Sequence, residues 1–216
     1  MTTKLKITLL ALSAIFMVSA CKKKIEDVSM VVTASYPTIT ITGSQFYSIP
    51  VGGTLPSVSA TAFDSTLKES CTTSLDASGL DNSTPGIYFV PINSKNHLGY
   101  KSSLNVLVAV TNVADSINIS GTYTRTATGV AVQVNEVKNG LYSVDNLFGA
   151  ASTPNTYAYF VMVDDSTMIM PDQPTSVGDL STSNNFLHTL PADTSYGYKI
   201  TSNITSNRVL RVFQKN

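Results

Sequence analysis

The stretch DNSTPGIYFVPINSKNHLGYKSSLNVLVAV, residues 81–110, decides the fold class because it predicts two strands joined by one loop. A Pro-Gly pair at residues 85–86 marks a turn before the apolar run Ile87–Ile92. The loop covers Ser94–Gly99, and a long second strand follows over Tyr100–Val110, with Leu or Val at every second position from 104 onwards. This alternation places those side chains on one face, which we expect to be buried.

The segments before this hairpin carry the same strand-and-turn pattern. Met30–Gly43 shows alternating β-branched residues, and a bend is predicted around Pro50 and Gly52-Gly53 before the short strand SVSATAF. About seven short strands within about 80 residues are typical of an immunoglobulin-like sandwich. We therefore predict a domain of this kind over residues 30–111.

The polar segment TNVADS, residues 111–116, predicts a short junction to a second β domain over residues 117–216. Asn139-Gly140 is a strong hairpin signal, and a further turn is expected at Asp164–Ser166. Roughly six to eight antiparallel strands point to a barrel or a strongly curved sheet. The predicted fold class is all-β: an immunoglobulin-like sandwich followed by an antiparallel β-barrel or strongly curved sheet.

Both halves resemble surface lipoproteins of the Bacteroidota. The motifs that carry the resemblance are turn, strand and core elements: VGGT at 51–54, TPGIY at 84–88, NHLGY at 96–100, SGTYTR at 120–125, NGLYSVD at 139–145 and RVLRVFQK at 208–215. The resemblance implies the two β domains. Such proteins are often encoded near starch-utilisation-type glycan uptake systems, so the resemblance also implies a glycan or a neighbouring uptake-complex protein as partner.

The N-terminal segment predicts an exported, lipid-anchored protein. A basic head precedes an apolar run of about twelve residues, which is shorter than the ~20 residues of a membrane-spanning helix. The following VSAC, residues 18–21, resembles the bacterial lipobox. This resemblance implies a signal peptide over residues 1–20, fatty acylation such as palmitoylation at Cys21, and a tether over residues 21–29. The alternatives are an ordinary signal peptide with an incidental cysteine, or a short membrane helix.

Charge bounds the compartment and the partners. The chain has 14 basic and 14 acidic residues, and removal of residues 1–20 takes away Lys4 and Lys6 but no acid, which leaves a net charge of −2. Lys22–Lys24 would lie beside anionic head groups. The acidic pair Glu26-Asp27 comes only after them, so an outer-membrane anchor facing the cell surface and one facing the periplasm both stay open. A nucleic-acid partner is not expected.

The residues that could carry catalysis or bind a metal are few. Cys71 is the only cysteine besides Cys21, so no disulfide within the chain and no cysteine-based metal motif is expected. The two histidines, His97 and His188, stand far apart in the sequence, and no G-x-S-x-G motif occurs. The carboxylate pair Asp164-Asp165 falls at a predicted turn. We therefore expect no cofactor, no metal and no enzyme activity.

Tyrosines at period-two spacing are the candidate ligand contacts. Tyr157 and Tyr159 share one face of a predicted strand, and Tyr196 and Tyr198 share one face of another. An exposed pair could stack on a sugar ring, whereas an inward pair would be core. The predicted function is an accessory binding module in glycan acquisition. The alternative is a structural spacer or scaffold for a surface complex, which the absence of an exposed aromatic cleft would favour.

Three Asp-Ser pairs followed by an apolar residue or Thr match an O-glycosylation pattern of organisms with such lipoproteins. The acceptor residues are Ser65, Ser116 and Ser166, each within a predicted loop, turn or junction. Surface loops are accessible to a modifying enzyme. The pattern therefore predicts glycan attachment at these three hydroxyls.

Overall fold

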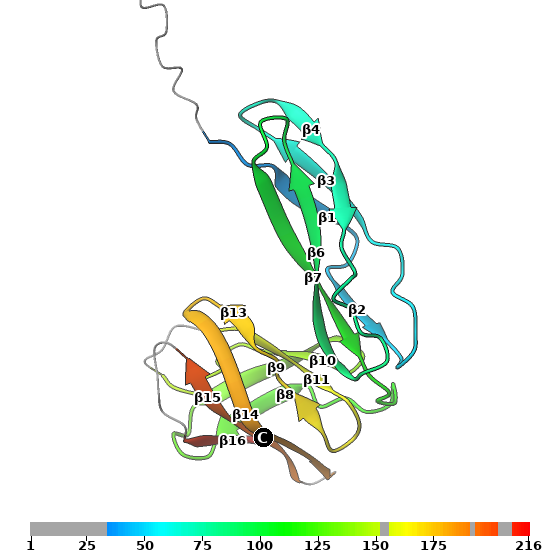
Figure 1. The fold of residues 1–216 in the computed structure, drawn as a ribbon. Helices are drawn as coiled ribbons and strands as arrows, with labels where there is room; N and C mark the ends of the chain where they lie inside the picture. Colours follow the sequence, from blue (N-terminus) through cyan, green and yellow to red (C-terminus); the bar gives the residue numbers. More distant parts are fainter. Residues whose placement is uncertain (1–33, 152–155, 191–192, 203–208) are drawn as a thin grey trace, which may run out of the picture. The chain divides into compact units, whose positions relative to one another are not determined.

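The computed structural model describes residues 34–151, 156–190, 193–202 and 209–216. Within these ranges the regular secondary structure consists of the strands β1 to β16, without a helix (Figure 1). This confirms the predicted all-β class. The same ranges contain no helix long and apolar enough to cross a membrane. The predicted signal peptide, Cys21 and the tether lie outside the described residues. The chain from Ser35 to Asn216 is one compact unit.

Two sheets build the N-terminal sandwich. The three-stranded sheet has the order β1-β3-β4, and the four-stranded sheet has the order β2-β7-β6-β5. Neighbours pair antiparallel except β2 and β7, which run parallel. The bounds are β1 (Thr38–Thr42), β2 (Phe46–Ile49), β3 (Ser59–Asp64), β4 (Glu69–Cys71), β5 (Thr73–Leu75), β6 (Gly86–Lys95) and β7 (Lys101–Val110).

Strand β7 supplies the centre of the sandwich core, as its alternation predicts. Val106, Val108 and Val110 are fully buried in one cluster with apolar residues of β2 and β6. Leu104, earlier on the same face, is half-buried. The opposite face of β7 is also covered, because Ala109 packs in a separate apolar cluster described below.

A nine-stranded antiparallel sheet forms the C-terminal half. Its order is β12-β11-β10-β9-β8-β16-β15-β14-β13. The bounds are β8 (Gly121–Arg125), β9 (Ala131–Lys138), β10 (Leu141–Val144), β11 (Ala158–Met162), β12 (Met168–Ile169), β13 (Gln173–Thr175), β14 (Gly178–Leu190), β15 (Asp193–Ser202) and β16 (Leu210–Lys215). The predicted hairpins at Asn139-Gly140 and at Asp164–Ser166 join β9 to β10 and β11 to β12.

The two edge strands of this sheet follow each other in the chain. Only Met170–Asp172 separate β12 from β13, and four Cα steps span at most roughly 14 Å. The sheet must therefore curl until its edges nearly meet, which is the strongly curved form that the sequence predicts. The predicted count of six to eight strands is wrong. The long β14 escapes prediction because its sequence is polar and its register shifts between Ser183 and Phe186.

Aromatic side chains fill the inside of the curved sheet. Six fully buried rings come from five strands: Tyr123, Tyr142, Phe160, Tyr196, Tyr198 and Phe213. The Tyr196 ring contacts four of the others, and Tyr142 stacks on Phe160. The rings of Tyr196 and Phe213 lie 4.9 Å apart at 10°, and those of Tyr123 and Tyr196 meet edge to face at 5.0 Å. Such pairs add to the stabilisation from burial itself.

A third apolar cluster joins the sandwich to the curved sheet. It buries Ile87 and Ala109 of the sandwich against Leu141 and Val161 of the curved sheet. The hydroxyl of Thr111 donates a hydrogen bond to the carbonyl of Met162 beside this cluster. We call this contact region the seam. The centre of the seam is apolar, and an apolar interface favours limited motion between neighbouring domains.

Candidate functional site

The two predicted tyrosine pairs lie in opposite environments. Tyr196 and Tyr198 have no exposed surface, and burial raises the pKa of both phenols. The Tyr198 hydroxyl donates to the carbonyl of Leu147 at 2.8 Å. These rings cannot stack on a ligand from outside, so the proposed contact surface on this pair is wrong. Their strand points them inward because the positions between and beside them carry Ser, Gly and Lys.

Tyr157 and Tyr159 lie on the outer face of the curved sheet. The alternate residues Ala158 and Phe160 point into the core. Tyr159 is half-buried and packs on Phe46 with ring centroids 5.5 Å apart. Tyr157 is 56% exposed. Of the four candidate tyrosines, only Tyr157 has an exposed ring, and its neighbour Tyr159 packs against the seam.

The side chain of Gln173 ties Tyr159 to the other edge of the sheet. Its amide nitrogen donates to the Tyr159 carbonyl, and its oxygen accepts from the Tyr159 N–H, both at 2.8 Å. Gln173 is buried and also lines a groove on the neighbouring strands. Gln173 thus connects β11, which begins directly after Tyr157, to this groove.

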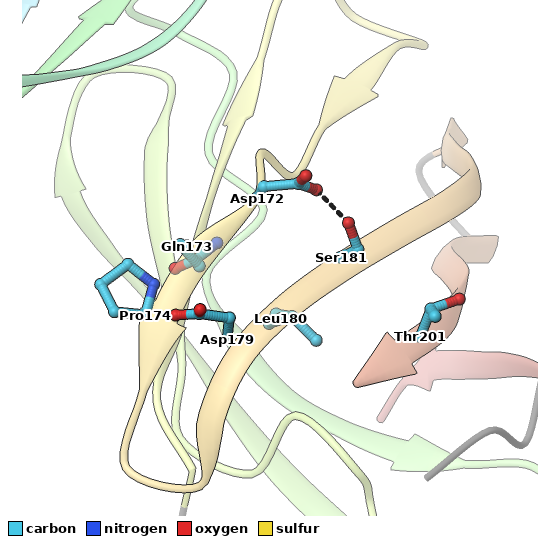
Figure 2. Close-up of a pocket in the computed structure, with 7 residues that line it drawn as sticks. All are labelled: Asp172, Gln173, Pro174, Asp179, Leu180, Ser181 and Thr201. Carbon is cyan, nitrogen blue, oxygen red and sulfur yellow. Dashed lines mark hydrogen bonds between the residues drawn. The ribbon is translucent and has the colours of Figure 1, made fainter. Parts of the chain in front are cut away.

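The groove has a volume of about 440 Å³ and lies over β13, β14 and β15 (Figure 2). Its polar outer residues are Asp172, Asp179, Ser181 and Thr201. The Ser181 hydroxyl donates to the Asp172 carboxylate at 2.5 Å. Leu180 points the other way and is buried, so alternation on β14 turns Asp179 and Ser181 outward. Carboxylates accept several hydrogen bonds each, which suits a ligand rich in hydroxyls.

Cys71, Glu69 and His97 lie close together although the sequence gives no motif for them. The Cys71 thiol is 4.0 Å from a Glu69 carboxylate oxygen, and the other oxygen is 2.7 Å from His97 Nδ1. The His97 backbone N–H and then its ring lower the pKa of Glu69. Burial and the nearby Glu69 charge raise the pKa of the Cys71 thiol. Both effects disfavour the thiolate, which is the nucleophilic form of cysteine.

A buried polar network fixes the point where the chain enters the fold. The Asp64 carboxylate accepts hydrogen bonds from the Ser35 hydroxyl, the Asn96 amide and the backbone N–H groups of Thr66 and Leu67. Burial alone would raise the Asp64 pKa, but these donors outweigh it and lower the pKa to about 2. Ser35 and Asn96 lie 29 and 32 positions from Asp64 in the sequence. No local sequence pattern therefore predicts the network.

The three predicted glycosylation hydroxyls all belong to exposed residues. Ser65 lies in the β3–β4 turn, Ser116 in the connection before β8, and Ser166 in the β11–β12 turn. Their preceding aspartates differ. Asp64 is fully buried, whereas Asp115 and Asp165 are exposed. A modifying enzyme that must contact the aspartate reaches Ser116 and Ser166 in the folded protein but not Ser65, so modification at all three sites stays a prediction.

No group of three or more His, Cys, Asp and Glu side chains in the described residues could hold a metal ion. Comparison with known proteins adds little. No protein-family model and no curated protein matches the chain. Among solved structures, the chain is similar to a lipoprotein of Bacteroides thetaiotaomicron at 18% identity and a TM-score of 0.37. The match covers 83% of this chain and 100% of that one. At this TM-score the likeness supports neither a fold assignment nor a function.

Proposed function

We propose that the protein is a lipid-anchored, non-enzymatic module of the bacterial envelope that binds a glycan at Tyr157 and the groove over β13 and β14. The observation that carries the proposal is the exposed Tyr157 ring two residues before Tyr159, whose ring packs on Phe46 and whose backbone is bonded to Gln173 in the lining of a polar groove. The C–H face of a sugar ring is apolar and suits an aromatic surface. Its hydroxyl groups need convergent acceptors and donors such as Asp179 and Thr201.

The sequence supports the anchor in this proposal. VSAC at residues 18–21 places Cys21 directly after a short apolar run, as lipidation requires. Two or three acyl chains would hold the protein durably, since each buried methylene contributes about 0.8 kcal/mol. The resemblance to envelope lipoproteins supports the outer membrane as the anchored surface and glycan acquisition as the setting. Labelling of cells with a clickable fatty acid, comparing wild type with Cys21→Ser, tests the anchor separately from the ligand.

The non-enzymatic part of the proposal rests on the arrangement of reactive groups. The raised pKa of Cys71 opposes its use as a nucleophile. The exposed carboxylates of the groove, Asp172 and Asp179, are of the kind that could also act as acid and base in glycoside hydrolysis. Incubation with each bound glycan, followed by a reducing-end assay, tests this point. If the wild type releases shorter sugars and Asp179→Asn does not, the protein is a glycoside hydrolase and the non-enzymatic proposal is wrong.

A screen of surface polysaccharides and plant glycans on an array tests the ligand class. The protein from its native host is applied to the array, and retention of a restricted set of related glycans is the expected result. Retention of none contradicts glycan binding. In that case the structural spacer is the remaining candidate function.

The seam is the specific observation that favours the second candidate, a structural spacer. Its apolar cluster and the Thr111–Met162 hydrogen bond make a stiff connection between two β halves. None of the four described pockets has an aromatic lining residue, and these four include the groove over β13 and β14. A spacer would cross-link to a neighbouring envelope protein in intact cells, and Tyr157→Ala would leave both that cross-link and the array result unchanged.

A further inference from the structure

Three segments meet at the end of the sandwich where the described chain begins. They are Ser35–Pro37, the β3–β4 turn at Ser65–Lys68, and the β6–β7 loop at Asn96–Tyr100. Asn96 donates to both the Ser35 carbonyl and the Asp64 carboxylate, and His97 contacts Glu69. We call this end of the fold the entry pole. Its buried network holds the chain entry and the loop in one fixed arrangement.

The entry pole exposes apolar side chains. Tyr36 is 58% exposed and packs edge to face on Tyr100 at 5.3 Å, and Leu98 on the adjoining loop is 47% exposed. A single exposed apolar residue is ordinary. Here two large ones lie on segments that share the same hydrogen-bonded network, and one of them is a tyrosine, a residue enriched where membranes meet water.

Two lysines lie directly opposite each other beside this loop. Lys95 ends β6, Lys101 begins β7, and the register pairs them. Both are exposed, and among the described residues neither forms an ion pair. Like charges opposite each other on neighbouring strands destabilise a sheet. An anion between them would remove that cost.

A groove of about 420 Å³ adjoins the lysine pair. Lys95 and Lys101 line it together with small polar residues: Thr72, Ser74, Asn93, Ser94 and Ser102. The Ser94 hydroxyl is already used, because it donates to the Thr72 carbonyl. Cationic and hydroxyl donors around a shallow groove are the chemistry that receives a phosphate group.

The position of the entry pole in the chain indicates which phosphate. Fourteen Cα steps separate Cys21 from Ser35, so the pole can lie at most roughly 50 Å from a lipid on Cys21 and can come much closer. The acidic side chains nearest the loop are not positioned to repel a bound phosphate. Asp64 is fully buried, and Glu69 is directed to His97. The exposed charge of the loop and its flanking strands is positive.

From these observations we propose that the entry pole docks on the anionic lipid surface that holds the anchor. Lys95 and Lys101 bind the phosphate of a head group, while Leu98 and Tyr36 enter the interface between head groups and acyl chains. The inference rests on the lipid anchor of the proposed function and not on glycan binding. A lipid anchor combined with a basic surface gives firmer and better oriented attachment than either alone.

The test uses mature lipidated protein in vesicles of phosphatidylglycerol and phosphatidylethanolamine, in vesicles of phosphatidylcholine, and in neutral detergent. Backbone hydrogen exchange is followed in residues 96–101. We expect exchange to slow by about tenfold or more only in the anionic vesicles. High salt should restore fast exchange, since it screens exposed charges. The double variant Lys95→Gln, Lys101→Gln should also exchange fast in the anionic vesicles, because it lacks both cationic side chains.

Matched controls separate docking from general effects. Lys138→Gln, at an exposed lysine of β9, and Leu190→Ser, at a leucine that is 63% exposed, should leave the slow exchange unchanged. Leu98→Ser should weaken it. Equal exchange in all three environments, with the protein still co-sedimenting with vesicles, overturns docking alone. Failure to co-sediment refutes the anchor and docking together, and neither result bears on glycan binding by Tyr157.

Discussion

The side-chain amide of Gln173 pairs with the backbone of Tyr159 as a neighbouring strand would. It gives one hydrogen bond and accepts one, both at 2.8 Å. Gln173 begins β13 at one edge of the nine-stranded sheet, while Tyr159 lies on β11, next to the opposite edge. The pairing therefore spans the gap that the strand ladder leaves open, and it satisfies two backbone groups that are costly to leave unpaired.

Removal of this pairing should loosen the closing edge of the sheet. Gln173→Ala leaves the Tyr159 N–H and carbonyl without partners, so we expect the free energy of unfolding to fall by about 1–3 kcal/mol. Gln173→Glu keeps the acceptor but turns a carboxylate oxygen toward the Tyr159 carbonyl in a buried position, so at neutral pH it should destabilise at least as much as Gln173→Ala. Urea denaturation measures each value. Gln214→Ala, which removes hydrogen bonds to the exposed Asp193 carboxylate and to the Thr194 carbonyl, is the control, and an equal loss there contradicts the account.

The two buried tyrosines should respond differently to loss of one oxygen atom. The Tyr196 hydroxyl is buried and has no hydrogen-bond partner among the described residues, whereas the Tyr198 hydroxyl donates to the carbonyl of Leu147. Tyr196→Phe should therefore be neutral or stabilising. Tyr198→Phe should cost about 1 kcal/mol because it leaves a buried carbonyl unpaired. Thermal melts of the pair check this order, and a larger loss at Tyr196 would show that its hydroxyl has a role the structure lacks.

The same tyrosines show what the sequence could predict. Tyr196, Tyr198 and Ile200 alternate with Ser195, Gly197 and Lys199, so comparison of the two faces already indicates an inward pair. Around Tyr157 and Tyr159 the other face carries Ala158 and Phe160, which indicates the opposite orientation. The predicted hairpins and the β7 core needed only such local signals.

Other features depend on contacts that local patterns do not encode. The Gln173–Tyr159 pairing requires knowledge that two edge strands meet, and β14 is a polar strand whose partners alone define it. The Ser35–Asp64–Asn96 network joins three distant segments. Ser, Asp and Asn are common turn residues, so their identity in the sequence does not distinguish members of this network from ordinary turns.

Asp64 should make the free energy of unfolding decrease at acidic pH. Its pKa is lowered from 3.8 to about 2 in the folded protein, so the unfolded chain takes up a proton first as the pH falls. The contribution is present above about pH 4 and is lost between about pH 4 and about pH 2. Urea midpoints across this range should fall more steeply for wild type than for Asp64→Asn. Parallel curves would exclude Asp64 as a source of the acid dependence.

A glycine pair isolates the packing of the seam. Gly140 and Gly129 have similar φ angles of 71° and 68°, so a side chain adds similar backbone strain at both. At Gly140 a Cβ would lie 2.6 Å from Val113 Cγ1, whereas at Gly129 nothing lies within 4 Å. Gly140→Ala should be less stable than Gly129→Ala by about 1–3 kcal/mol. Equal stabilities would show that the contacts beside the seam are loose.

The glycan contact is the central claim, and one calorimetric comparison tests it. The strongest ligand from the array is titrated into wild type, Tyr157→Ala and Tyr36→Ala, where Tyr157 and Tyr36 are 56% and 58% exposed. Tyr157→Ala should weaken binding by about 1–3 kcal/mol, between roughly 5-fold and 150-fold, with an unchanged melting temperature, while Tyr36→Ala binds as wild type. Equal affinities for all three proteins would contradict the proposed site.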